Sequence, residues 1–416
     1  MNRTLFLPLL LPLAALAQSA ATDTGKAAWE RKQLTPHFWA EGANFGDFNK
    51  DGKMDVVYGP YWWEGPDFTK RHTYADDAKT SKIKKADGAE ETVPGFKGAL
   101  GTENDYSKNF LAYTHDFNAD GWTDIVILGF PGEQSYWYEN PKGGEDKWTR
   151  NVALDVTDNE SPHFTDITGD GQPEIVCSSK GFLGYASFDP KSAGAPWTWH
   201  NISPKGGWQK FTHGMGVGDV NGDGRMDFIE ANGWWEQPAS LAGDPVWKLH
   251  EAKFGPGGAQ MFAYDVNGDK KNDIITSLEA HGYGVAWFER TDEGGAPGWT
   301  KHIIVGKKPE ENPQGIVFTQ PHALDLADMD GDGLKDLVTG KRFWAHGPGG
   351  DADPNGTPVL YWFKLSREGG AVKWTGNLID DASGVGTQVV AGDINGDKKP
   401  DVVVGNKRGA FLLLRR

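Results

Sequence analysis

The sequence is organised around one acidic motif of nine residues that occurs seven times. In the copy Asp219–Asp227 (DVNGDGRMD), oxygen-bearing side chains stand at positions one, three, five and nine, and Gly224 stands at position six. Ca²⁺ takes about six to eight hard oxygen ligands, and alternate residues of a tight loop can direct that many inward. The glycine permits the positive-φ turn that lets the loop wrap. Because position nine leads directly into the apolar pair Phe228 and Ile229, the motif predicts a calcium loop between two strands.

The other copies repeat the pattern. The expected calcium ligands are Asp47, Asn49, Asp51 and Asp55; Asp116, Asn118, Asp120 and Asp124; Asp166, Thr168, Asp170 and Glu174; Asp219, Asn221, Asp223 and Asp227; Asp265, Asn267, Asp269 and Asp273; Asp328, Asp330, Asp332 and Asp336; and Asp393, Asn395, Asp397 and Asp401. The alternative is an Asp- and Gly-rich turn that needs no metal. It has most force for the two copies with Lys270 and Lys398 at position six.

The spacing and composition of the repeats predict the fold. Successive copies start 46 residues apart at the closest (Asp219 to Asp265) and 69 at the widest (Asp47 to Asp116), a range typical of propeller blades. Each repeat holds a strand before the loop, a β-branched strand after it, an aromatic strand and a strand led by Trp. Four such strands repeated seven times predict an all-β, seven-bladed β-propeller of four-stranded blades. The tryptophan of each third strand (Trp62, Trp234, Trp362) is expected to pack between blades, with stacking on a sugar as the alternative.

The two ends of the sequence predict how the ring closes. The last repeat stops after its third strand, Phe411–Leu414, and the missing fourth-strand pattern occurs at Trp29–Leu34. An N-terminal strand that completes the C-terminal blade would leave no open sheet edge. We therefore expect residues 22–416 to form one propeller domain.

Residues 1–17 have the pattern of a secretory signal peptide. Arg3 provides the charged start, Leu5–Leu16 the apolar region, and Ala15–Ala17 the small-residue cleavage site. No later stretch reaches the roughly 18 apolar residues of a transmembrane helix. The chain is therefore expected to be exported to the periplasm or the extracellular space, without membrane insertion. Its single cysteine, Cys177, excludes an intramolecular disulfide.

The net charge of −16 comes mostly from the seven motifs, which hold 22 carboxylates: three in each copy and four in the Asp328 copy. Seven Ca²⁺ ions would return about 14 positive charges and nearly neutralise the chain. The acidity therefore indicates metal binding. Since no basic cluster offsets it, the composition argues against nucleic-acid and anionic-membrane partners.

At these loops the sequence resembles the FG-GAP and VCBS repeats of β-propellers, over nearly the whole mature chain. That resemblance implies a β-propeller fold and calcium binding, but it implies little about activity. Three segments, Glu279–Gly284, Gln320–Asp325 and Gly340–Gly347, are similar to the propeller portion of fungal aldos-2-ulose dehydratase and of its bacterial relatives that act on 1,5-anhydrofructose. This similarity implies a dehydratase acting on a keto-sugar. The cupin domains that accompany the fungal propeller are absent, so an isomerase step associated with them is not implied.

The strand order places the starts of the first strands and the second-to-third loops on the face opposite the calcium loops. His213 and His322 each lie six residues before the first Asp of a calcium loop, and Glu160 and Glu41 occupy the same place in two other repeats. Imidazoles and carboxylates that converge at a channel mouth can bind Zn²⁺ or another divalent ion. Glu160, His213 and His322 are therefore the candidate ligands of a catalytic metal. The alternative for each histidine is a hydrogen-bonded loop residue.

Two further histidines, His281 and His346, lie in second-to-third loops. They are the candidate proton carriers, because an imidazole titrates near neutral pH. The other candidates from these loops are Glu279 and Arg342 for catalysis, the latter to stabilise an enediolate-like oxygen, and Lys341 and Trp344 for substrate binding.

Two functions fit this pattern. The first is a carbohydrate lyase or dehydratase, in which a metal or Arg342 polarises the carbonyl of a keto-sugar and a His or Glu takes the α-proton. The second is a non-catalytic propeller that binds a glycan or a protein on the same face. The sequence shows no Ser/His/Asp order, no nucleotide-binding glycine pattern and no paired zinc CxxC motif. The identity of the sugar and the oligomeric state are not indicated.

Overall fold

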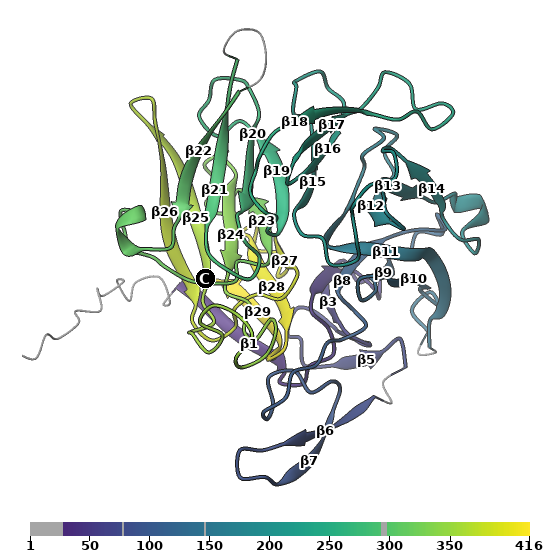
Figure 1. The fold of residues 1–416 in the computed structure, drawn as a ribbon. Coiled ribbons are helices and arrows are strands. Elements are labelled where there is room, and N and C mark those ends of the chain that lie inside the picture. Colours follow the sequence, from purple (N-terminus) through teal and green to yellow (C-terminus); the bar gives the residue numbers. More distant parts are fainter. Residues whose placement is uncertain (1–27, 77–78, 145–146, 293–297) are drawn as a thin grey trace, which may run out of the picture.

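Figure 1 shows the computed structural model of the chain, which describes residues 28–76, 79–144, 147–292 and 298–416. In these residues the chain forms seven four-stranded antiparallel blades in sequence order, as predicted. The innermost strands of neighbouring blades lie next to each other, and the last of them lies next to the first, so that the ring is closed. The expected signal peptide falls outside the described residues. No helix among them is long and apolar enough to cross a membrane.

Blades 1 to 4 are formed by residues 43–251. Blade 1 contains β2 (Ala43–Gly46), β3 (Asp55–Tyr58), β4 (Tyr61–Trp63) and β5 (Arg71–Thr73). Blade 2 contains β8 (Leu111–His115), β9 (Asp124–Leu128), β10 (Glu133–Glu139) and the first part of β11 (Thr149–Thr165), and blade 3 contains the rest of β11, β12 (Glu174–Ser179), β13 (Phe182–Ser187) and β14 (Thr198–Asn201). Blade 4 contains β15 (Met215–Gly218), β16 (Asp227–Glu230), β17 (Gly233–Glu236) and β18 (Lys248–Glu251). The long strand β11 is shared: it pairs first with β10 and then with β12.

The remaining blades complete the ring. Blade 5 contains β19 (Gln260–Tyr264), β20 (Asp273–Ser277), β21 (Val285–Thr291) and β22 (Gly298–Val305); blade 6 contains β23 (Leu324–Ala327), β24 (Asp336–Gly340), β25 (Leu360–Glu368) and β26 (Ala371–Asp380); blade 7 contains β27 (Val389–Gly392), β28 (Asp401–Asn406), β29 (Gly409–Arg415) and β1 (Trp29–Thr35). The 3-10 helices η2 (Pro190–Ser192) and η4 (Pro309–Glu311) lie in connections. The long connection between blades 1 and 2 forms a hairpin, β6 (Thr80–Lys84) and β7 (Glu90–Pro94), which projects from the ring in Figure 1.

The N-terminal strand closes the last blade. β1 pairs antiparallel with β29, so that Trp29 lies opposite Arg415 and Gln33 opposite Phe411. The Trp29 ring is buried and packs with Phe411 in the core that blades 6 and 7 share. The prediction of closure from the incomplete last repeat is therefore confirmed.

Blades are held together by side chains on their facing sheets. The aromatic third strand supplies the largest of them, and Trp62, Trp234 and Trp362 are each buried. On the outer strand, His72 stacks on Trp62 at 4.0 Å and His250 stacks on Trp234 at 4.1 Å between ring centroids. These tryptophans are therefore packing residues, and none presents a free face to a sugar.

Each acidic loop is built by hydrogen bonds from its own backbone. In the fourth copy, Asp219 Oδ1 accepts from the amides of Gly222 at 2.6 Å and Asp223 at 3.1 Å, and Asp219 Oδ2 accepts from Gly224 at 2.9 Å. Asp227, at position nine, is fully buried and accepts from two further amides, those of Val220 and Gln237. The position-nine carboxylate thus joins the loop to the end of the third strand.

The two copies without glycine adopt the same turn. Lys270 and Lys398 both have φ of +70°, and their amides donate to Asp265 Oδ2 at 3.2 Å and Asp393 Oδ2 at 3.0 Å. The left-handed conformation costs a non-glycine residue about 1–2 kcal/mol, which the surrounding hydrogen bonds offset. Lack of glycine therefore does not set these copies apart from the others.

Burial raises the pKa of several position-nine carboxylates, and the charges of the neighbouring loop acids raise it further. The pKa of Asp124 and that of Asp227 both rise to about 7. A proton or a cation relieves the repulsion. Because a raised folded-state pKa stabilises the protein at low pH, this contribution is lost as the pH rises through the folded pKa. Acidic loops of this composition are suited to Ca²⁺, which would replace the proton.

Removal of Ca²⁺ should therefore make stability depend on pH. In a chelator, the melting temperature should fall as pH rises from 6 to 8, and excess Ca²⁺ should restore it and flatten the dependence. Thermal melts at the two pH values, with and without Ca²⁺, measure this. Asp223→Ala should reproduce part of the loss. Melting curves that do not respond to chelator would contradict a structural role for calcium.

Removal of the closing strand should destabilise blade 7. A chain that begins at Pro36 exposes the β29 edge and loses Trp29, and burial of a tryptophan contributes about 3–5 kcal/mol. We expect aggregation in gel filtration and a lower denaturation midpoint. A chain that begins at Ala28 keeps β1 and serves as the control. Equal stability of both chains would show that β1 does not close the ring.

Candidate metal centre

The site lies where the innermost strands begin. Seven equivalent positions, each six residues before the first Asp of an acidic loop, are occupied by Glu41, Phe110, Glu160, His213, Ala259, His322 and Thr387. Three of them come together. Glu160 Oε2 lies 3.3 Å from His322 Nε2 and 3.6 Å from His213 Nε2. The register of the repeats therefore places the expected ligand set in one cluster.

His281 joins this cluster from the loop that follows β20. Its Nε2 lies 3.2 Å from His213 Nε2, and its ring centroid lies 5.0 Å from that of His322. One ligand atom from each of Glu160, His213, His281 and His322 lies within 4.8 Å of the others. His281, expected as a proton carrier, is thus placed among the candidate ligands. Three imidazoles and one carboxylate form a donor set typical of Zn²⁺.

The protonation states suit a cation. Burial and the charge of Arg342 lower the pKa of His322 to about 4, so that this imidazole is neutral at pH 7. Burial would raise the pKa of Glu160, but hydrogen bonds with His213 and His322 hold that pKa well below its usual value. Neutral imidazoles and an ionised carboxylate are the forms that bind metal. The buried Nδ1 atoms of His281 and His322 have no hydrogen-bond partner among the described residues, so the donors present fit a divalent ion.

Arg342 supports the cluster from within the protein. Its side chain is 2% exposed, Nη2 donates to Glu41 Oε2 at 2.9 Å, and Nη1 lies 3.0 Å from His322 Nε2. The two carboxylates of Glu41 and Glu160 outweigh its charge, so that the cluster keeps a net negative charge. A buried and paired guanidinium is a positioning group, and the expected contact of Arg342 with a substrate oxygen does not fit this geometry.

The expected substrate-binding residues are also buried. Lys341 is 1% exposed and its Nζ donates to Thr319 Oγ1 and, at 2.6 Å, to the carbonyl of Asp353. Trp344 is 8% exposed and its indole donates to Asn355 Oδ1 at 2.8 Å. Both side chains hold the loop between β24 and β25 in place. Neither is free to contact a substrate, because its polar atom already has a partner inside the protein.

Glu279 and His346 remain accessible. Glu279 is exposed and lines, with His213, His281 and Tyr283, a cavity of about 480 Å³. The side chain of His346 is 49% exposed, and its ring packs on that of His281 at a centroid distance of 4.2 Å. These two residues are the most exposed of the four predicted catalytic groups.

Asp351, which the sequence analysis missed, orients both loop histidines. Its Oδ1 lies 2.8 Å from His346 Nδ1 and 3.7 Å from His281 Nδ1, and its Oδ2 accepts from the His346 amide at 2.9 Å. A proton on His346 Nδ1 directed at this carboxylate leaves Nε2 with a free lone pair. Asp351 lies five residues from His346 in an irregular loop, where no strand periodicity predicts which way a side chain points.

Gln320 and Lys407 were also missed. Gln320 is fully buried at a φ of +57°, and its backbone bonds to Gly282 and Arg342. Lys407, from blade 7, is buried and donates to the carbonyls of Trp344 and Ala345 at 2.9 Å. These residues tie the site loops of different blades together. The only signal for Gln320 in the sequence was its place before Pro321 and His322.

Comparison with known proteins supports the repeat assignment. Residues 116–177 match an FG-GAP-like repeat and residues 385–411 match an FG-GAP repeat. The chain therefore carries FG-GAP repeats, as the acidic loops predicted. No curated protein matches it by sequence.

Similar solved structures share little sequence with this chain. They include the V. cholerae biofilm matrix protein Bap1 (19% identity, 66% of this chain and 40% of that chain, TM-score 0.33), an auxiliary nutrient binding protein from Bacteroides ovatus (11% identity, 80% and 82%, TM-score 0.43) and rhamnogalacturonan lyase YesW (12% identity, 92% and 72%, TM-score 0.39). The chain spans less than half the length of the Bap1 chain.

Proposed function

We propose that this protein is a metal-assisted carbon–oxygen lyase that removes water from a keto-sugar, such as 1,5-anhydrofructose, by β-elimination. The observation that carries the proposal is the cluster of Glu160, His213, His281 and His322 beside a cavity, with the accessible His346 packed against it. Two residues of the cluster, His281 and His322, belong to segments similar to the propeller portion of aldos-2-ulose dehydratase.

The four-residue cluster would hold a divalent ion such as Zn²⁺. When bound, the ion would supply Lewis acidity for the carbonyl oxygen of the sugar. A carboxylate beside the outer ring nitrogen of a ligating histidine fixes the orientation of that ring. Asp351 has this position beside His281 Nδ1, and Glu41 holds Arg342, whose Nη1 lies beside His322 Nε2.

His346 would act as the general base. Its Nδ1–H donates to Asp351, so that Nε2 accepts the proton from the carbon next to the carbonyl. The electron pair of that C–H bond forms the carbon–carbon double bond, and the hydroxyl on the β-carbon leaves. The proton taken up by His346 would be passed through Glu279, exposed at the cavity, to that hydroxyl, which departs as water. Lys341 and Trp344 contribute by holding the loop that carries His346.

Variants of His346 and Asp351 test this proposal. His346→Ala should lower turnover of 1,5-anhydrofructose at least about 100-fold, as expected for loss of a general base. Asp351→Asn should lower it and also weaken zinc retention by about 10- to 100-fold. His250→Ala, which removes an outer-strand histidine stacked on Trp234, is the control.

The assay is ultraviolet detection of the unsaturated product, and thermal melts in Ca²⁺ check folding. Full activity of folded His346→Ala would remove the proposed base. If the wild-type protein binds glycans but turns over no keto-sugar, the alternative holds and the chain is a binding module.

A further inference from the structure

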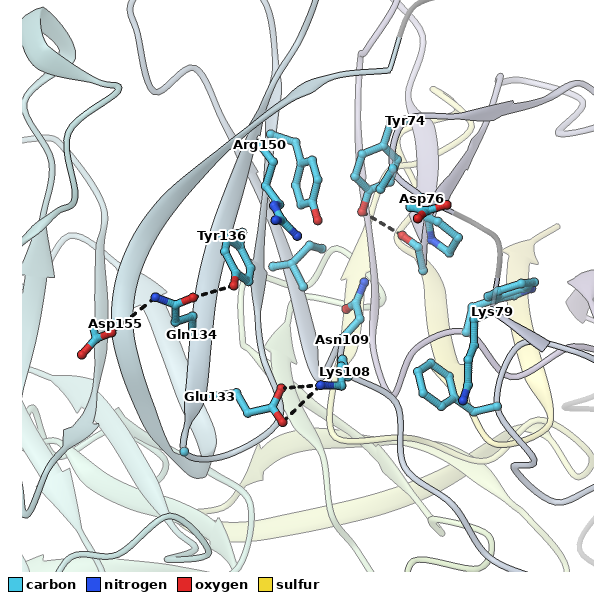
Figure 2. Close-up of a pocket in the computed structure, with 18 residues that line it drawn as sticks. Tyr74, Asp76, Lys79, Lys108, Asn109, Glu133, Gln134, Tyr136, Arg150 and Asp155 are labelled. Carbon is cyan, nitrogen blue, oxygen red and sulfur yellow. Dashed lines mark hydrogen bonds and ion pairs between the residues drawn. The ribbon is translucent and has the colours of Figure 1, made fainter. Parts of the chain in front are cut away.

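A second cavity, separate from the histidine cluster, lies between blades 1 and 2. It has a volume of about 590 Å³, within the roughly 300–1,000 Å³ typical of small-molecule pockets. Figure 2 shows its side chains. One wall comes from blade 1 and carries Trp39 and Tyr74; the other comes from β10 and β11 and carries Tyr136, Tyr138 and Arg150. Sequence analysis singled out none of these residues.

The charged side chains that line this cavity differ in whether they have an oppositely charged partner. Its lining carboxylates have basic partners: Glu133 lies 3.3 Å from Lys108 Nζ, and Asp155 lies 2.7 Å from Lys180 Nζ. Arg150 differs. Among the described residues no carboxylate lies within ion-pair distance of Arg150; its guanidinium interacts with the Tyr138 hydroxyl and lies 4.6 Å from the centroid of the Tyr136 ring. In a chain with a net charge of −16, an exposed arginine that lies between two tyrosines favours an anionic ligand.

Polar groups surround the aromatic rings. The Tyr136 hydroxyl donates to Gln134 Oε1 at 2.6 Å, and Gln134 Nε2 donates to Asp155 at 3.3 Å, as Figure 2 shows. A polar network beside aromatic rings suits a ligand that carries several hydroxyl groups, and the rings suit its C–H faces.

We infer that the blade 1–blade 2 cavity binds an acidic saccharide, a short oligosaccharide of uronic acid units. Its carboxylate pairs with the Arg150 guanidinium in the two-pronged geometry that arginine offers to carboxylates. Its hydroxyls bond Gln134, and one ring face packs against the tyrosines of β10. A neutral sugar would leave Arg150 without its counter-ion.

The cavity lies close to the metal centre along the chain. Asn109 lines the cavity, and its carbonyl accepts from the amide of Glu41, the residue that holds Arg342. Three residues before Asn109, the Tyr106 ring lies 6.5 Å from that of His346. The segment 106–109 thus separates the two sites. Saccharide binding in the cavity does not depend on the proposed lyase chemistry.

Isothermal titration calorimetry with trigalacturonate tests the inference, with cellotriose as the neutral counterpart. The wild-type chain in Ca²⁺ should bind trigalacturonate at least tenfold more tightly than cellotriose. Arg150→Ala and Tyr136→Ala should each weaken binding at least tenfold, and Arg150→Lys should weaken it less than Arg150→Ala. Arg71→Ala is the matched control, because Arg71 also lies over a tyrosine ring, that of Tyr61 at 4.0 Å, but outside this cavity.

The His213→Ala variant separates this site from the metal centre. It should bind trigalacturonate as tightly as the wild type. Loss of binding in His213→Ala with none in Arg150→Ala would place the saccharide at the histidine cluster and overturn the inference. No binding to the wild type, or equal affinity for the neutral trisaccharide, would overturn it as well. Thermal melts confirm that each variant is folded.

Discussion

The structure depends on the buried carboxylate at position nine of each acidic loop. Asp227 shows the arrangement: one oxygen accepts from Val220, at the second position of its loop, and the other from Gln237, after the third strand. Asp55, Asp124, Asp273, Asp336 and Asp401 make the same pair of bonds in their blades. Each of these six carboxylates therefore connects three strands through two charge-assisted hydrogen bonds, which are stronger than neutral ones. The same charge is buried and is repelled by the other loop acids, and a cation at the loop would offset both effects.

This arrangement separates the two faces of the propeller. The face with the acidic loops is nearly the same in every blade, because each loop must satisfy the same backbone groups. The opposite face is free to differ. At the seven equivalent positions there, Phe110 and Ala259 are apolar, whereas Glu160, His213 and His322 form a polar cluster. Function can therefore develop on one face without disturbing the hydrogen bonds that hold the other.

Repetition explains what could be predicted from the sequence. Seven copies of one motif set the register of every innermost strand, so the approach of Glu160, His213 and His322 followed from counting six residues back from each loop. Closure by Trp29 followed in the same way from an incomplete last repeat. The turn at Lys270 was harder, because its conformation depends on a backbone hydrogen bond to Asp265 that the side chain does not reveal.

Irregular loops explain what could not be predicted. Between β24 and β25 the chain has no periodicity, so the sequence did not show that Lys341 and Trp344 turn inward or that Asp351 reaches both loop histidines. Arg342 was misjudged because its partner, Glu41, lies about 300 residues away. The cavity around Arg150 lies between two blades, and the sequence pattern of each blade taken alone indicates only packing.

The central claim is that one divalent ion lies among Glu160, His213, His281 and His322, apart from the calcium loops. Anomalous diffraction from crystals grown in Ca²⁺ and soaked in Zn²⁺, recorded on both sides of the zinc absorption edge, tests it most directly. We predict a zinc peak between these four side chains in the wild type and none there in His213→Ala. Zinc only at the acidic loops, or no ordered zinc, would contradict the account.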